Sequence, residues 1–189
     1  YLMSQGTFVC DVAVVYPVAP FEAGLDGAKA TQTAFDTGRA LMAAGINFEF
    51  IDADSLARAQ IRDGRLHATD SSYRVLVVPA MDAIRWSSLE RAGAFAQAGG
   101  VVLNVGSLPQ ASDRAGRDDQ QLDALVQTTF AADCRLSSPA DVPTKVLALL
   151  TPDTQAARPV RSHHRRIGHR DVYLVMDARK DSVVEFRAK

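Results

Sequence analysis

The sequence predicts an α/β fold, a three-layer sandwich in which helices cover both faces of a mostly parallel sheet, over residues 7–150. Two observations carry this prediction. Short apolar runs at 12–16, 75–78 and 101–105 are rich in β-branched residues and too short for core helices, as is typical of strands buried on both faces. A helical pattern lies between the second and third runs, and a strand–helix–strand unit with short links requires parallel strands.

The elements follow in order. Residues 1–6 resemble a helix terminus capped by Gly6, and we expect them to be the end of a preceding domain. After the first strand, Asp26 is a suitable N-cap for a helix that runs to Ala44 and ends at Gly45. We expect its inward face to comprise Ala34, Phe35, Gly38, Leu41 and Met42. Alternation at 48–51 indicates a strand near the sheet edge, followed by a short helix at 55–60 and a small strand or turn at 64–68.

The second buried strand ends at Pro79, and the next helix has capping-box spacing at Ser87 and Glu90. Gly99 and Gly100 end that helix before the third strand. Residues 110–117 suit an exposed loop, and Asp118 or Asp119 could cap a helix that buries Leu122, Leu125, Val126 and Phe130. A last helix at 139–150 places Val142, Val146, Leu149 and Leu150 on one side.

The hydrophobic pattern of the sequence changes at Thr151, and we expect residues 151–189 to form a β-rich segment. Runs at 160–167, 172–176 and 183–186 indicate antiparallel strands with turns at Gly168 and near Asp181. The basic stretch from Arg158 to Arg170 lacks interleaved aromatic residues, so a solvated or domain-contacting hairpin is favoured over an anion-binding or nucleic-acid site. His163, His164 and His169 lack a carboxylate or cysteine that would complete a metal site at useful spacing.

Composition excludes several classes of function. Twenty-one basic residues against 22 acidic ones give a net charge of -1, which argues against a general nucleic-acid binder. No apolar run approaches the ~20 residues that span a bilayer. Cys10 and Cys134 could form one disulfide, but free thiols are the favoured interpretation, and zinc spacing is absent. We therefore expect no metal and no cofactor, and the sequence leaves the localisation open.

Candidate chemistry lies at the carboxyl ends of the strands, where ligands bind in such sheets. Gly106 and Ser107 follow the third buried strand like a degenerate nucleophile elbow, although no histidine base is evident. Asp82, Arg85 and Trp86 could contact a carbohydrate, against the alternative that Trp86 is a hydrophobic staple of the following helix. Asp52 and Asp54 are explained more simply by turn chemistry and helix capping than by catalysis.

Five segments of the chain are similar to a known family. They read YLMSQGTFVCDVAVVYP, GINFEFIDADSL, YRVLVVPAMDAI, AGGVVLNVGSLP and HHRRIGHRDVYLVMD, and they resemble parts of large bacterial α-L-rhamnosidases of glycoside hydrolase family 106. The resemblance implies a class I glutamine amidotransferase-like, flavodoxin-like domain that follows a catalytic barrel and precedes β-sandwich domains. It also implies a relation to the β-galactosidase trimerisation domain. The family's catalytic carboxylates and calcium ligands match no position in this chain, and Gly106-Ser107 lacks the amidotransferase cysteine.

These inferences together predict a noncatalytic accessory or interface domain of a multidomain glycoside hydrolase that acts on plant or microbial polysaccharide. The catalytic barrel and the β-sandwich domains of the same polypeptide are its expected partners, with a homo-oligomer and a carbohydrate left open, and with neither nucleic acid nor membrane. A parent protein of this kind could be periplasmic or secreted. Two alternatives remain, namely a carbohydrate-contacting module that uses Trp86 and a degenerate amidotransferase-like hydrolase that uses Ser107.

Overall fold

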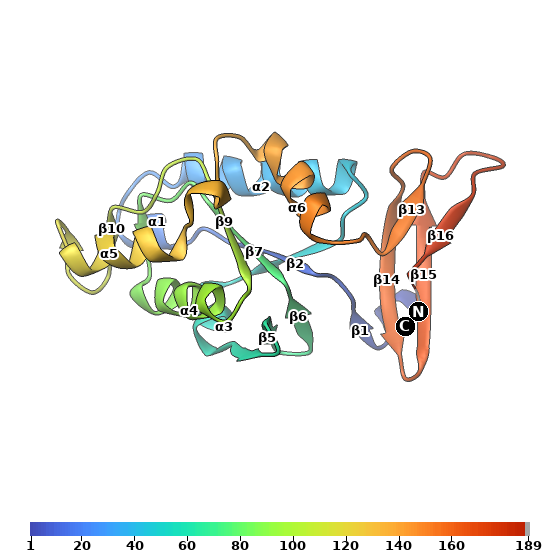
Figure 1. Cartoon of the computed structure of the whole chain (residues 1–189), viewed down its shortest axis with the longest axis horizontal. Helices are drawn as coiled ribbons and strands as arrows, with labels where there is room; N and C mark the ends of the chain where they lie inside the picture. Colours follow the sequence, from blue (N-terminus) through green and yellow to red (C-terminus); the bar gives the residue numbers. More distant parts are fainter. Residues whose placement is uncertain (188–189) are drawn as a thin grey trace.

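A computed structural model describes residues 1–187 and shows a five-stranded, wholly parallel sheet at the centre of the α/β part (Figure 1). The last two residues of the β-rich segment expected at 151–189 lie outside the described residues. The strands stand in the order β12 (Arg135–Leu136), β9 (Val101–Val105), β7 (Val75–Pro79), β2 (Val12–Val15) and β3 (Phe48–Ile51). Numbered by their sequence within this sheet, they have the order 2-1-3-4-5 of flavodoxin-like folds, so the predicted fold class is confirmed.

Helices cover both faces of this sheet, as Figure 1 shows. The first face packs against α2 (Ala28–Ala43) and α6 (Val142–Leu149). The second packs against α3 (Ala53–Arg58), α4 (Trp86–Gln97) and α5 (Gln120–Thr129). A four-residue helix, α1 (Ala19–Glu22), follows β2. Side chains of the central strands β2 and β7 therefore meet a helix on whichever face they point to, which is why these strands are apolar without alternation.

Three helical predictions need correction. Phe35 and Met42 do not face inward, since 42% and 44% of their surfaces are exposed, and Leu149 is also exposed. The capping box of Ser87 and Glu90 does not form. Helix α4 instead begins at Trp86, whose amide donates to Asp113 Oδ1 at 2.7 Å. A carboxylate from a distant loop thus replaces the local cap that the spacing suggested.

The predicted cap of α5 is confirmed, whereas the prediction for α2 needs correction. Asp119 accepts from the Gln121 amide at 3.0 Å at the start of α5. The N-cap of α2 is Gly27, not Asp26, and Asp26 accepts from the Ala28 amide at 2.9 Å from one residue before the N-cap. A 3-10 turn at Pro139–Asp141, labelled η3, leads into α6, and another at Ala132–Cys134, labelled η2, precedes β12.

Two small sheets flank the parallel one. Strands β4 (Gln60–Arg62), β5 (Arg65–Ala68) and β6 (Ser71–Tyr73) form an antiparallel meander between α3 and β7. The loop expected at 110–117 contains two-residue strands, β10 (Ala111–Ser112) and β11 (Gly116–Arg117), and β10 pairs with β8 (Ala83–Ile84).

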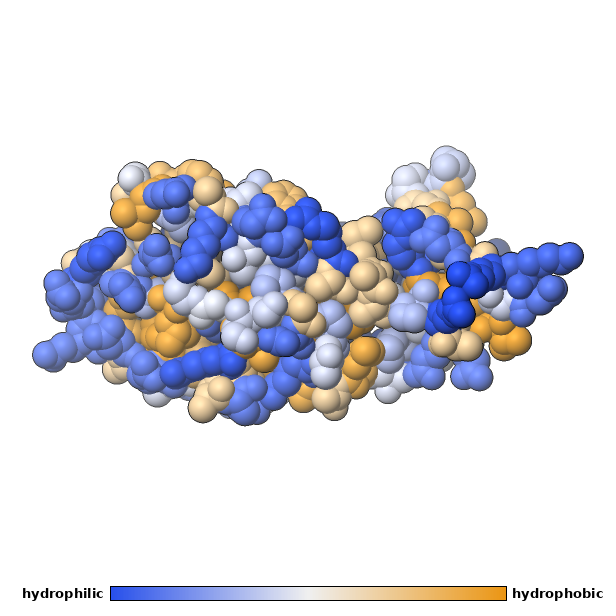
Figure 2. Space-filling view, turned by 90° about the horizontal axis from the view of Figure 1, so that it is seen from above, coloured by the Kyte–Doolittle hydropathy of each residue, from blue (hydrophilic) through white to orange (hydrophobic). Residues whose placement is uncertain are grey.

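The β-rich segment comprises two antiparallel units at one end of the molecule (Figure 1). Strand β14 (Arg161–Ile167) pairs with β15 (Arg170–Met176), and β13 (Thr154–Ala156) pairs with β16 (Val184–Phe186). The predicted strands and the turn at Gly168 are confirmed. Seen from above, this segment projects from the α/β part with hydrophobic and charged residues interspersed over the visible face (Figure 2).

The first residues of the chain belong with this segment in space. Residues Leu2–Ser4 form a short 3-10 helix, η1, that ends before Gly6, in keeping with the predicted helix terminus, and β1 (Thr7–Phe8) pairs with β14 rather than with the parallel sheet. Gly6 has a φ of 62°, and a Cβ added there would lie 2.0 Å from the Arg166 carbonyl oxygen. Only glycine fits this crossing, so the turn, the strand and the hairpin form one unit.

Candidate functional site

The carboxyl ends of the strands hold the residues that the sequence singled out, and Arg85 and Trp86 among them already contact other side chains. Arg85 donates from Nε to Glu22 at 2.9 Å and from Nη1 to Asp54 at 2.6 Å. The Arg114 guanidinium lies 4.4 Å from the centre of the half-buried Trp86 ring, and Arg114 is itself paired with Asp119. One face of Trp86 is thus covered by a cation. Asp82 is exposed next to Ala83 and Ile84 of β8.

Gly106 and Ser107 follow β9 in a sharp turn. Gly106 has a φ of 87°, and a Cβ added there would lie 3.0 Å from the Ala80 Cβ. The Ser107 hydroxyl has no hydrogen-bond partner among the described residues. Two of the histidines, His163 and His164, lie on β14 in the β-rich segment. The described residues therefore bring no base to Ser107, and the elbow cannot activate its hydroxyl.

The carboxylates near these ends serve structure. Asp52 accepts from the Ser55 amide at 2.8 Å and caps α3. Hydrogen bonds from the hydroxyl and amide of Ser55 hold the pKa of Asp52 below its usual value, and the Arg85 guanidinium does the same for the pKa of Glu22. Carboxylates that stay ionised in this way cannot serve as general acids near neutral pH.

The two cysteines are free thiols, as favoured from the sequence. Cys10 is buried, and its sulfur lies 3.7 Å from Glu49 Oε2, which also accepts from the Tyr73 hydroxyl at 2.9 Å. Burial and the nearby Glu49 carboxylate raise the pKa of Cys10, so the thiol is neither a thiolate nucleophile nor a soft metal ligand. Within residues 1–187, no group of three or more His, Cys, Asp and Glu side chains could hold a metal ion.

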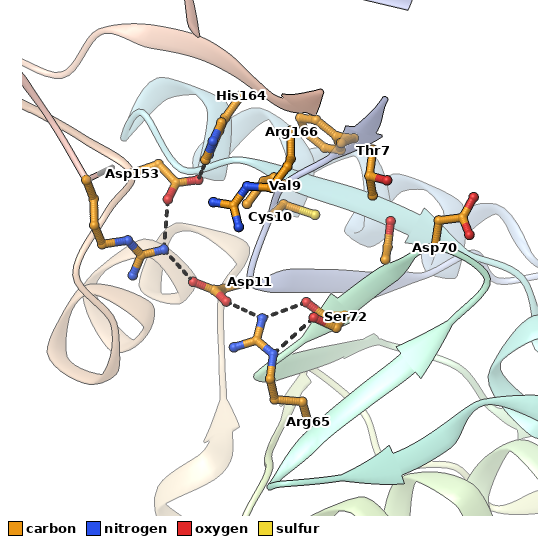
Figure 3. A pocket seen from close by; sticks show the side chains of 13 residues that line it. Thr7, Val9, Cys10, Asp11, Arg65, Asp70, Ser72, Asp153, His164 and Arg166 are labelled. Atoms are coloured by element: carbon orange, nitrogen blue, oxygen red, sulfur yellow. Dashed lines mark hydrogen bonds and ion pairs between the residues drawn. The ribbon is translucent and has the colours of Figure 1, made fainter. Parts of the chain in front are cut away.

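A chain of charged side chains joins the α/β part to the β-rich segment, and sequence reasoning missed it (Figure 3). Asp11, just before β2, pairs with Arg65 of β5 at 2.6 Å and with Arg187 at 2.9 Å. Arg187 also pairs with Asp153, the residue before β13, at 2.7 Å. These contacts come from sequence positions up to 176 residues apart, so their proximity depends on the tertiary fold.

These charged side chains adjoin His164, whose side chain is 2% exposed. Its Nδ1 lies 3.2 Å from Asp153 Oδ2 and its Nε2 lies 2.9 Å from Asp171 Oδ1. Asp171 also accepts from Arg166 at 2.6 Å, and the His164 ring stacks on Tyr173 with centroids 4.1 Å apart. The part of the basic stretch that includes His164 and Arg166 is therefore a domain-contacting hairpin, one of the two interpretations favoured from the sequence.

One signal in the sequence could have exposed part of this chain of charges. A two-residue turn at Gly168 and His169 sets the hairpin register, and this register pairs Arg166 with Asp171 directly across β14 and β15. Strand alternation then places His164 on the same face as Arg166. No comparable local signal points to Asp11 or Asp153.

A second feature is an exposed aromatic surface along the open edge of the parallel sheet, and we call it the aromatic edge. It comprises the exposed side chains of Tyr16 after β2, Phe35 and Met42 of α2, and Phe50 of β3, together with the half-buried Phe48 of β3. Phe50 contacts Tyr16, Phe35 and Phe48 with ring centroids 5.8, 5.6 and 5.4 Å apart in edge-to-face geometry. Tyr16 and Phe50 are 41% and 38% exposed, although aromatic side chains in such a cluster are usually buried.

The aromatic edge continues into an apolar groove beside the β-rich segment. This groove has a volume of about 270 Å³, and its lining includes Phe8, Met42, Phe48, His163 and Met176. Because β3 is the last strand of its sheet, no described strand pairs with its outer edge. An open strand edge flanked by exposed aromatic and methionine side chains is a surface suited to another protein segment.

The structure defines an α/β domain with a β-rich segment, and the comparisons give its family. The family described as alpha-L-rhamnosidase, glycoside hydrolase family 106, matches residues 1–189, so the chain belongs to this family. This confirms the resemblance stated from the sequence. A search of curated proteins found no match.

Solved structures agree with the fold. The chain resembles Gan42B, a GH42 beta-galactosidase, with a TM-score of 0.61 and 11% identity over 89% of this chain and 34% of that one. A catalytic mutant of the same enzyme from G. stearothermophilus gives a TM-score of 0.59 and 12% identity over the same shares. The chain thus spans about a third of the length of these β-galactosidase chains, and at such identity the likeness concerns the fold alone.

Proposed function

We propose that this chain is a noncatalytic accessory domain of a multidomain alpha-L-rhamnosidase-type glycoside hydrolase, and that it forms an interface. The parent enzyme would act on plant or microbial polysaccharide. The observation that carries the proposal is the aromatic edge. Contiguous exposed apolar surface beside an unpaired strand is costly to leave in water and typically marks a contact with another protein surface.

The noncatalytic part of the proposal rests on the carboxylates. Glycoside hydrolysis usually needs two carboxyl groups across one sugar, about 5–5.5 Å apart for retention or about 6.5–9.5 Å for inversion, and one of them must be protonated. Asp52 and Glu22 are held ionised by their hydrogen bonds, and Asp54 is paired with Arg85. Asp82 is exposed at this end of the sheet, but one carboxyl group cannot serve as both the acid and its partner.

The expected occupant of the aromatic edge is the catalytic barrel or a β-sandwich domain of the same polypeptide. Intramolecular docking needs less contact energy than association of separate chains, because the linker supplies a high effective concentration. A half-exposed aromatic cluster with one groove suits such a contact. None of the helices in the described residues is long and apolar enough to cross a bilayer.

The test compares the parent enzyme carrying Phe35→Ser and Phe50→Ser with a matched control carrying Phe21→Ser. Phe21 is also exposed, but it has no aromatic partner among the described residues. The proposal expects the double variant to lower the melting temperature of the parent by several degrees more than the control, with little change in this chain alone. Equal shifts for the double variant and the control would contradict the interface.

Catalysis is tested separately. This chain alone should not hydrolyse an aryl α-L-rhamnoside, whereas the parent should. Turnover by the chain that is lost on Asp52→Asn, Asp54→Asn or Asp82→Asn would overturn the noncatalytic assignment. An esterase or glutaminase rate that Ser107→Ala abolishes would favour the degenerate hydrolase instead.

A further inference from the structure

A cavity of about 350 Å³ lies at the junction of the α/β part and the β-rich segment (Figure 3). Its walls are formed by the link from β1 to β2, by the turn from β5 to β6, and by the charged side chains that join the two parts, such as Arg65, Asp153 and Arg187. Arg166 lies above it, Arg65 below it and Asp70 at one end in Figure 3. We propose that this cavity binds a neutral monosaccharide unit.

Unengaged polar groups reach the cavity from several directions. Asp70 and Thr7 line it, and the side chains of both are without a hydrogen bond to the described residues. Arg65 uses Nε and Nη2 for Ser72 and Asp11, which leaves Nη1 available. Arg166 uses Nε and Nη2 for Asp171, which also leaves Nη1 available within the described part of the chain. The cavity therefore offers a carboxylate acceptor, a hydroxyl and two guanidinium donors.

This combination of hydrogen-bond donors and acceptors suits the hydroxyl groups of a sugar. A sugar hydroxyl donates one hydrogen bond and accepts others, so it needs acceptors and donors at close quarters. Phe8 and Val9 add an apolar wall for the C–H face of a ring, and Phe8 is held by stacking on His163 with centroids 4.5 Å apart. The cavity size falls at the lower end of the range for small-molecule pockets.

Charge balance argues for a neutral ligand rather than an anion. Three carboxylates line the cavity, namely Asp11, Asp70 and Asp153, and three guanidiniums face them from Arg65, Arg166 and Arg187. Asp11 and Asp153 already neutralise Arg65 and Arg187, and Asp171 neutralises Arg166. An anion would meet no uncompensated positive charge and would lie near the free carboxylate of Asp70.

The walls are also preorganised. Arg65 is fixed by three hydrogen bonds, two to Ser72 and one to Asp11, and Arg166 is fixed by Asp171 behind it. A ligand would therefore lose little affinity to ordering of the site. The cavity shares Phe8 with the apolar groove, but its lining includes none of the residues of the aromatic edge, so the sugar proposal and the interface proposal can fail separately.

The experiment is a titration of the isotopically labelled chain with L-rhamnose, D-galactose and sodium acetate, followed by amide NMR shifts. The proposal expects saturable amide shifts at residues 7–11 and 70–72 with at least one of the sugars, with a dissociation constant in the millimolar range. Asp70→Asn and Thr7→Val should each weaken this binding, the former by about tenfold, because one hydrogen bond to a charged group is lost. Neither side chain has a partner among the described residues, so both variants should fold normally.

The matched control is Asp123→Asn, an exposed carboxylate on α5 away from the cavity, which should leave binding unchanged. Phe35→Ser with Phe50→Ser should also leave it unchanged. Three results would overturn the proposal. These are saturable shifts with acetate alone, sugar-induced shifts confined to the surroundings of Trp86, and no saturable shift with either sugar.

Discussion

The parallel sheet and the β-rich segment are both β structure, yet different forces hold them. Every side chain of β2 and β7 is buried, and these strands contact helices on both faces. In β14 and β15 burial is partial and uneven, and the segment is tied to the rest of the molecule through Asp11, Arg187, Asp153 and His164. Solvent exclusion holds the first region and paired charges hold the second, so the two should respond to different perturbations.

The largest expected effect is in the apolar core. Phe95 of α4 is fully buried against the sheet, and Phe95→Ala should lower the free energy of unfolding by about 3–5 kcal/mol, through lost burial and the cavity left behind. Urea denaturation measures this, with the slope of the transition unchanged. Phe21→Ala, at an exposed phenylalanine, should cost less than about 0.5 kcal/mol, and similar losses at the two positions would refute the assignment of the core.

The next largest effect concerns the charged side chains that join the α/β part to the β-rich segment. Asp153→Asn removes the charge that faces both Arg187 and His164. Because Arg187 keeps Asp11 and some contact with water, we expect a loss of about 2–3 kcal/mol, below the ~3–5 kcal/mol typical of a broken, fully buried pair. Amide hydrogen exchange should accelerate more in β13 to β16 than in β7 and β9.

The control for this prediction is Asp177→Asn, which breaks the exposed pair with Arg161. Water screens such surface pairs and they contribute little to stability, so exchange in both regions should be nearly unchanged. If Asp153→Asn accelerated exchange equally in the sheet and the β-rich segment, the two regions would be one cooperative unit and the comparison would fail.

A smaller effect is the contribution of Asp11 to the pH dependence of the free energy of unfolding. Burial raises the pKa of Asp11, but hydrogen bonds and charges from Arg187 and Arg65 outweigh it and hold the pKa below the usual value. The folded state thus binds a proton less readily than the unfolded state. The stabilisation is present above the unfolded pKa of about 4 and is lost as the pH falls through the folded pKa.

Asp11→Asn should therefore be less stable at pH 6 and lose less further stability than the wild type between pH 6 and pH 3. Denaturation curves at both pH values measure the difference. Parallel losses in the two proteins would show that Asp11 contributes nothing to the acid sensitivity of the junction.

The smallest effect is at Trp86. Arg114→Ala removes the guanidinium over the ring and its pair with Asp119, and we expect a smaller loss of stability than for the preceding variants. Trp86 is the single tryptophan of the chain, so its fluorescence reports on its own surroundings. Acrylamide quenching should increase in the variant, and unchanged quenching would mean that Arg114 does not shield the ring in solution.

Much of the fold was predictable because its determinants are local. The apolar runs of β2, β7 and β9, the cap at Asp119 and the turn at Gly168 each lie within a few residues of what they specify. Predictions failed where a distant partner intervened. Asp113 caps α4 in place of Ser87 and Glu90, and Phe35 turns toward Phe50 of the edge strand instead of the core.

Residue patterns alone were enough to predict the parallel sheet and the antiparallel character of the β-rich segment, because periodicity and turn chemistry are read within one element and its neighbours. The family followed from the resemblance of five segments of the sequence to known members. The folded arrangement was needed to establish that Asp11 meets Arg187, that Phe8 and Thr7 join the hairpin, and that Tyr16, Phe35 and Phe50 form one exposed cluster. Charge pairs and surface clusters join residues far apart in the chain, and no pattern along the sequence records which distant side chains the fold brings together.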